Sequence, residues 1–212
     1  MIYAENILIC IAVPLAISLL FVRGSARRFI ISFLVGMAMC LIGAYIGGFV
    51  DSVTEMSTND ISIFISPIIE EMTKFAPLLI YVLFLEPEEG RMFIVATGVG
   101  AGFATFENCC HILTSGAENF IFIMIRGFST GIMHIVSILA VVIGLVIVRR
   151  FRAVSVAGVV GALSLSMSFH GLYNLLVSEP GLTSYIGYAL PLITSILLYA
   201  GFMRLRPDTS EL

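Results

Sequence analysis

The sequence predicts an all-α integral membrane protein, folded as one bundle of seven transmembrane helices. Hydrophobic residues make up 59% of the 212 residues and charged residues only 12%, against ~25% charged residues in an ordinary soluble domain. The mean hydropathy of +1.07 points the same way. The apolar runs are about 20 residues long, the length of a membrane-crossing helix, whereas strands of a membrane barrel need only ~10. A net charge of −3 offers no basic face, so the expected surroundings are a lipid bilayer and no nucleic acid.

Seven segments are long and apolar enough to cross a bilayer. They cover residues 2–22, 29–50, 61–85, 92–113, 119–148, 153–177 and 183–203. The short connections hold most of the Gly, Pro, Asp, Glu and Arg, and a polar tail starts at residue 204. No connection is long enough to divide the chain, so residues 1–212 are expected to form a single transmembrane domain.

Each segment carries a feature that supports its assignment. The first has no basic residue before its apolar stretch, and Arg23 follows it, so it is expected to be a retained span rather than a cleaved signal. The second, fourth and fifth contain pairs of glycines four residues apart, which permit close helix contact. The third contains Pro67 and Pro77, each of which removes a backbone hydrogen bond and can kink the helix. The sixth and seventh are mostly apolar over their whole lengths, and the sixth also carries His170 and Asn174.

Basic residues divide unevenly between the connections. Those after the first, third, fifth and seventh spans hold nine, and the other connections hold none. The nine are Arg23, Arg27, Arg28, Arg91, Arg149, Arg150, Arg152, Arg204 and Arg206. Because basic connections stay cytoplasmic, we expect the N-terminus outside and the C-terminus inside.

Eight ionisable residues fall inside the predicted spans: Glu70, Glu71, Lys74, Glu107, His111, Arg126, His134 and His170. A charge at mid-bilayer costs at least ~2.5 kcal/mol on insertion scales, so such residues usually face one another or a wet cavity. A rise of 1.5 Å per residue puts the two adjacent acids roughly 14 Å below the outer boundary and His134 deepest. The sequence therefore predicts that Glu70, Glu71, Glu107, His134 and His170 line one cavity open to the outer face. The alternative is that these residues only hold the helices together. In that case Glu70 pairs with Lys74, Arg126 neutralises Glu107, and Asn174 makes an interhelical hydrogen bond.

The adjacent acids also suggest a chemistry. Two neighbouring carboxylates in a low dielectric cannot both ionise cheaply, so one holds a proton while the other is free to act as a base. Such a base can activate water for attack on a peptide carbonyl, while His170 and Asn174 stabilise the oxyanion. Glu70 shares a helix face with Lys74, which favours Glu70 as the ionised base and leaves Glu71 to bridge to a histidine.

A zinc ion is the open alternative for the same cluster. Catalytic zinc needs three protein ligands and a water, and Glu107, His134 and His170 are the candidate ligands. The His-Glu-x-x-His pattern of many soluble zinc proteases is absent. The sequence therefore requires no cofactor and leaves zinc as an option.

The motifs between residues 61 and 177 resemble those of PrsW-type intramembrane proteases, in the same order along the chain. Glu70–Lys74 matches Glu-Glu-x-x-Lys, and Phe106-Glu107 matches Phe-Glu-x-x-x-Tyr with His111 in place of the tyrosine. Arg126 with His134, and His170 with Asn174, are similar to the later histidine motifs. The wider group includes type II CAAX-prenyl proteases, bacteriocin-processing enzymes and the scaffold subunit of gamma-secretase. In the CAAX-type relatives a histidine stands where this chain has Glu107.

The resemblance implies an intramembrane endopeptidase in which Glu70 and Glu71 carry the water-activating carboxylate. His134, His170 and Asn174 are the implied polar partners, with Lys74, Arg126 and His111 in support. Glu107 is a further catalytic candidate, whose role stays open because the CAAX-type relatives have a histidine there. The expected substrate is a membrane-anchored protein or peptide, cut near the extracytoplasmic face of a prokaryotic plasma membrane. The alternatives are a non-catalytic scaffold, a zinc-dependent protease and, less favoured because no internal repeat is visible, an ion-coupled transporter.

Overall fold

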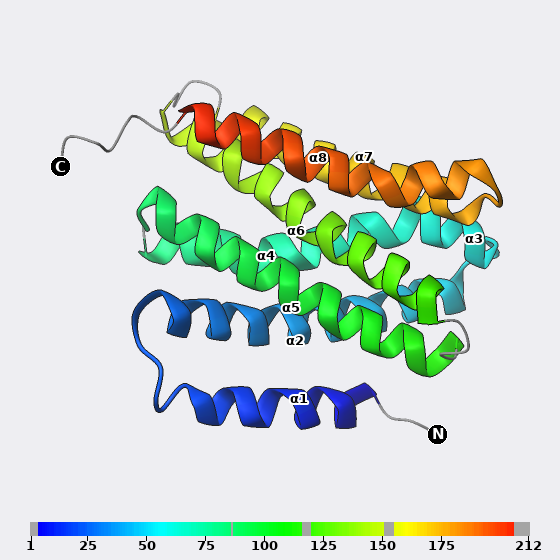
Figure 1. The fold of residues 1–212 in the computed structure, drawn as a ribbon, viewed down its shortest axis with the longest axis horizontal. Coiled ribbons are helices and arrows are strands. Elements are labelled where there is room, and N and C mark those ends of the chain that lie inside the picture. Colours follow the sequence, from blue (N-terminus) through cyan, green and yellow to red (C-terminus); the bar gives the residue numbers. More distant parts are fainter. Residues whose placement is uncertain (1–3, 86, 116–119, 151–154, 206–212) are drawn as a thin grey trace.

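The computed structural model describes residues 4–85, 87–115, 120–150 and 155–205, and all of its regular elements are helical. Seven helical rods run up and down the bundle (Figure 1). In chain order the elements are α1 Ala4–Ser18, α2 Gly24–Val53, α3 Thr58–Asp60, η1 Ile61–Ile65, α4 Ser66–Leu85, α5 Glu89–Ser115, α6 Phe120–Arg150, α7 Ser155–Ser178 and α8 Leu182–Leu205. The third rod consists of α3, the π-helical turn η1 and α4. The predicted all-α class is confirmed.

The count of seven membrane spans stays a prediction. Five of the described helices, α2, α5, α6, α7 and α8, are long and apolar enough to cross a membrane. Helix α1 has 15 residues, which gives a length of about 22 Å. Helix α4 carries Glu70, Glu71 and Lys74. Arg152 and Arg206, which support the predicted orientation, lie outside the described residues.

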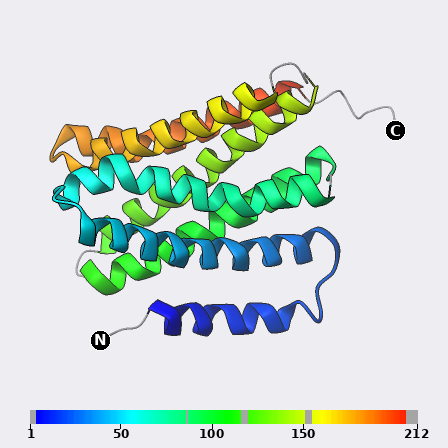
Figure 2. The same cartoon turned by 180° about the vertical axis from the view of Figure 1, so that it is seen from behind.

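The helices are stacked from one edge of the bundle to the other. Helix α1 lies at one edge against α2, and α7 and α8 lie together at the opposite edge (Figures 1 and 2). Helices α2 and α5 approach so closely that a Cβ at Gly36 would sit 2.1 Å from the Val99 carbonyl oxygen, and one at Gly102 would sit 2.0 Å from that of Phe33. The glycine pair in α5 therefore serves helix contact, as its spacing predicts.

The interior of the bundle changes character along its length. Toward the C-terminal half of α4 the core is apolar, and its buried side chains include Phe75, Leu78, Val99, Ile138 and Val142. Toward the end that holds α3, the interior contains buried charged and polar side chains instead. Large apolar side chains on the outer surface complete the pattern of an integral membrane protein. The polar end of the interior is where the predicted site residues meet.

Candidate active site

Four helices bring the predicted site residues together. Helix α4 carries Glu70, Glu71 and Lys74, α5 carries Glu107, α6 carries Arg126 and His134, and α7 carries His170 and Asn174. The two acids are adjacent on α4 and therefore project about 100° apart. Because of this angle, the two side chains lie in different surroundings.

Glu71 lies at the centre of a buried network. Its side chain is 1% exposed. Oε1 lies 2.5 Å from Lys74 Nζ and 2.8 Å from His170 Nδ1, and Oε2 accepts a 2.6 Å hydrogen bond from Ser166 Oγ. Ser137 Oγ lies 3.2 Å from Oε1. Both oxygens have partners, and together these partners lie on α4, α6 and α7. Glu71 therefore holds the bundle together and fixes the ring of His170.

Lys74 is fully buried, and its ammonium has three partners. Nζ contacts Glu71 Oε1, His134 Nδ1 at 2.9 Å and Ser137 Oγ at 3.1 Å. The expected pairing of Lys74 with Glu70 is therefore wrong. Glu71 lies with Lys74 on the side of α4 that faces α6 and α7, whereas Glu70 lines cavities outside this network. The predicted bridge from Glu71 to a histidine is confirmed at His170.

Glu70 has surroundings unlike those of Glu71. Its side chain is 21% exposed, and Oε2 lies 3.7 Å from His170 Nε2. Oε2 is itself buried and has no hydrogen-bond partner among the described residues. A buried carboxylate oxygen left without a partner is costly, so this atom is poised to accept a hydrogen bond or bind a cation.

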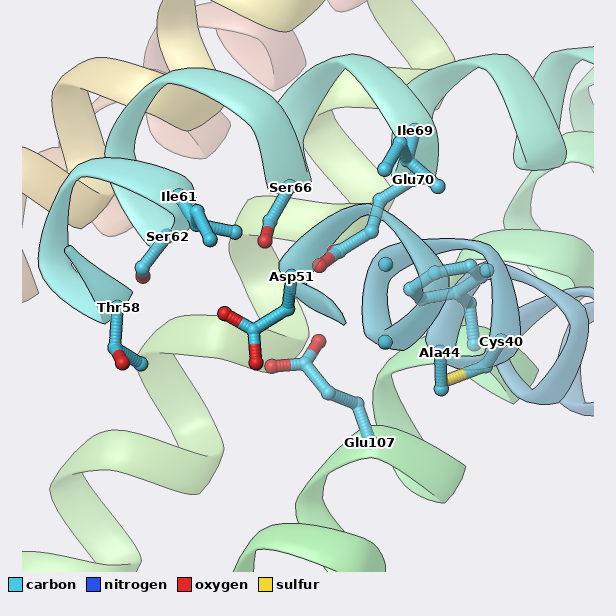
Figure 3. Close-up of a pocket in the computed structure, with 14 residues that line it drawn as sticks. Cys40, Ala44, Asp51, Thr58, Ile61, Ser62, Ser66, Ile69, Glu70 and Glu107 are labelled. Atoms are coloured by element: carbon cyan, nitrogen blue, oxygen red, sulfur yellow. The ribbon is translucent and has the colours of Figure 1, made fainter. Parts of the chain in front are cut away.

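Two cavities meet at Glu70 and Glu107. The α2 cavity, of about 320 Å³, is also lined by Gly43, Ala44, Gly47 and Asp51 of α2. Figure 3 shows the carboxylates of Asp51, Glu70 and Glu107 pointing into it. The α6–α7 cavity, of about 310 Å³, is also lined by His111, Arg126, His170, Tyr173 and Asn174. Ser62 and Ser66 border both cavities.

Glu107 links α5 to α6. One oxygen contacts His134 Nε2, and Oε1 lies 3.6 Å from Arg126 Nη2. Arg126 Nη1 also donates a 2.9 Å hydrogen bond to Asn108 Oδ1. Since Lys74 donates to Nδ1 of His134, the remaining hydrogen of the neutral imidazole lies on Nε2 and points at Glu107.

The structure divides the predicted cavity residues into two groups. Glu70, Glu107 and His170 line the cavities. Glu71 and His134 lie behind them, 1% and 0% exposed. The predicted residues therefore form one cluster, with a cavity-lining layer and a buried layer.

Sequence reasoning missed the serines of the network and the buried hydroxyl contact of Tyr173. Ser137 lies one turn after His134, and Ser166 one turn before His170, so helical spacing from the two histidines could have found both. Tyr173 is 3% exposed, and its hydroxyl lies 2.9 Å from Thr130 Oγ1. Asp51 could not be recognised as a cavity residue from the sequence, because it lies just beyond the end of the second predicted span.

A metal-binding group also emerges. Glu70, His134 and His170 each offer one ligand atom, and the three atoms lie within 4.8 Å of one another. Two imidazoles and one carboxylate form a donor set of catalytic zinc sites, and the contact of Glu71 with His170 Nδ1 is the usual outer support of a zinc-binding histidine. The donor set thus fits zinc, with Glu70 as the carboxylate ligand where the sequence analysis named Glu107. Both nitrogens of His134 already contact Lys74 and Glu107, so zinc would have to displace one contact.

Comparison with known proteins places the chain in a family. A family profile described as PrsW family intramembrane metalloprotease matches residues 24–201, which include every helix that contributes to the cluster. No curated protein and no solved structure gives a significant match. The profile covers most of the chain and all four motif-bearing helices, and the protein belongs to the PrsW family of intramembrane proteases.

Proposed function

We propose that this protease hydrolyses a peptide bond of a membrane-anchored protein near the extracytoplasmic face, with water activated by Glu70. The observation that carries the proposal is the difference between the adjacent acids. Glu71 is occupied by Lys74, His170 and Ser166, whereas Glu70 lines both cavities with a buried, unpartnered oxygen. Of the two acids, Glu70 is the one that water and a substrate can reach.

The roles follow from the geometry around Glu70. The 3.7 Å between Glu70 Oε2 and His170 Nε2 is too long for a direct hydrogen bond, and the Glu70 side chain is 21% exposed. A water can reach this side chain from either of the cavities that it lines. Glu70 takes a proton from the water as it attacks the peptide carbonyl, and returns that proton to the amide nitrogen as the C–N bond breaks and the amine leaves. Glu71 fixes the His170 ring through Nδ1, so the Nε2 side of the ring faces the reacting atoms. In its protonated form His170 donates from Nε2 to the developing oxyanion. The oxyanion role of Asn174 stays a prediction.

The two cavities suggest how the substrate lies. Their linings differ, because the α2 side offers small residues such as Gly43, Ala44 and Gly47, while the α6–α7 side offers Arg126 and Asn174. We propose that the substrate backbone crosses Glu70 with one flank in each cavity. A Cβ at Gly47 would meet no atom within 4 Å, so the α2 cavity has room for a substrate side chain there.

A zinc-dependent version of the protease is the second candidate, favoured by the mutual proximity of Glu70, His134 and His170. Zinc in such a site supplies Lewis-acid activation of water or of a carbonyl oxygen. In that case Glu70 would serve as a ligand, and Glu107, the other carboxylate that borders both cavities, would accept the proton.

The test is cleavage by the purified protein in proteoliposomes, with a single-span membrane protein as substrate and H₂¹⁸O as solvent. Hydrolysis by water predicts one ¹⁸O atom in the new C-terminal carboxylate, located by mass spectrometry toward the extracytoplasmic end of the substrate. A scaffold subunit would give no cleavage. A product without ¹⁸O after one turnover, or a cut at the cytoplasmic end, would contradict the proposal.

A further inference from the structure

The segment that leads into α4 contains a backbone carbonyl that its own helix cannot satisfy. In the π-helical turn η1, each carbonyl accepts from the N–H five residues later, and the Ser66 N–H indeed donates to the Ile61 carbonyl. The next pair in this pattern would join the Ser62 carbonyl to the N–H of residue 67. Residue 67 is proline, which has no N–H.

Asn174 supplies the missing donor from another helix. Its Nδ2 donates a 2.9 Å hydrogen bond to the Ser62 carbonyl oxygen, across 112 positions of sequence. Helix α7 comes close to η1 at the same place, since a Cβ at Gly171 would sit 3.1 Å from the Ile63 carbonyl oxygen. Gly171 and Asn174 lie one turn apart on α7, so the same face of α7 provides both the close approach and the hydrogen bond.

The position of Ser62 gives this hydrogen bond a functional consequence. Ser62 borders both cavities together with Glu70, eight residues further along the same rod. A shift of η1 would therefore move the wall that faces the Glu70 carboxylate. The hydrogen bond to Ser62 therefore gives Asn174 a route to the site through the backbone of η1.

We propose that Asn174 is a positioning residue, whose amide replaces the N–H that Pro67 lacks and thereby holds η1 against α7 beside the candidate base. The role in catalysis rests on the proposed function, but the hydrogen bond itself does not. The amide nitrogen of Asn174 carries two hydrogens. The hydrogen donated to the Ser62 carbonyl is the one that matters for function.

The proposal leads to a rescue experiment with Pro67. Asn174→Ala removes the side-chain donor that fixes the Ser62 carbonyl, and is expected to lower both the midpoint of thermal unfolding and kcat/KM. Pro67→Ala supplies a backbone N–H at the position where the π pattern needs it. In the double variant that N–H takes the place of the amide, so both losses should shrink by more than half. Pro67→Ala alone should stay close to wild type in both measurements.

The two readouts separate the possible failures. Thermal unfolding in detergent tests the link between Asn174 and Pro67 without any need for activity, with about 3 °C lost in Asn174→Ala and most of it regained in the double variant. Additive effects of the two substitutions on unfolding would overturn the proposal. If stability is rescued but cleavage stays as low as in Asn174→Ala, the amide acts on the reacting atoms and the positioning role is wrong. If no variant, wild type included, cleaves any substrate, the proposed function fails while the unfolding result still decides the structural link.

Discussion

Lys74 Nζ lies 2.5 Å from Glu71 Oε1, and both side chains are almost completely buried. The same ammonium lies 2.9 Å from Nδ1 of His134, which in turn contacts Glu107 through Nε2. One buried cation therefore fixes one acid and orients one histidine. Glu70, the other acid of the adjacent pair, is left free to face the cavities.

The first prediction concerns this buried ion pair. Lys74→Met removes the ammonium and leaves the Glu71 carboxylate uncompensated, which is expected to cost about 3–5 kcal/mol of unfolding free energy. Glu71→Gln should cost a similar amount, because it leaves Lys74 without its counter-charge. The double variant should lose clearly less than the sum of the two, since neither charge is then buried alone. Reversible unfolding in mixed micelles measures all three, and additive losses would show that the two residues do not interact as the structure indicates.

Much of this arrangement could be predicted from the sequence. The seven helical rods follow from the apolar runs, and the gathering of Glu71, His134 and His170 follows from the cost of placing polar groups in lipid. These inferences use composition and depth along the helix axis, which a single sequence contains.

The pairings inside the cluster could not be predicted, because they depend on how each helix is rotated about its axis. Lys74 can reach a residue three or four positions earlier on a helix, so Glu70 and Glu71 were equally compatible with the spacing. In the structure α4 is rotated so that Lys74 pairs with Glu71. The π-helical turn could not be predicted either. Pro67 shows that one backbone N–H is missing, but the sequence does not show which helix supplies a donor in its place.

The second prediction concerns the α2 cavity. Gly47→Leu adds a side chain that fills part of the cavity without meeting an atom near its Cβ. It should lower cleavage of a substrate with a large side chain beside the scissile bond by about tenfold or more, with a smaller loss for a substrate with glycine there. The matched control is Gly161→Leu, at an exposed glycine of α7 that likewise has no atom within 4 Å of a Cβ. Equal losses in both variants, or a loss independent of substrate size, would mean that the α2 cavity does not receive the substrate.

The third prediction separates glutamate from zinc catalysis. Glutamate-activated water requires no metal, so protein purified in chelator should contain far less than one zinc per chain and should cleave at the untreated rate. Elemental analysis of the same sample measures the metal. About one zinc per chain, lost together with activity in His170→Gln and on chelation, would favour the Glu70, His134 and His170 site as a metal centre.

The fourth prediction is the topology. With seven crossings and basic connections inside, a reporter fused to the C-terminus should be active only in the cytoplasm. Fusions in the connections after α2 and after α4 test whether α4 crosses the membrane despite Glu70, Glu71 and Lys74. These two fusions should report opposite sides, and reports from the same side would show that α4 does not cross.

The last prediction addresses Glu70 as the base. Single-turnover cleavage by Glu70→Gln, compared with wild type in samples with the same unfolding midpoint, measures the chemical step most directly. The glutamine keeps the shape of the side chain and removes the proton acceptor, so the rate should fall by about 10²-fold or more while substrate binding and stability hold. Cleavage by folded Glu70→Gln at the wild-type rate would contradict the assignment of Glu70 as the group that activates water.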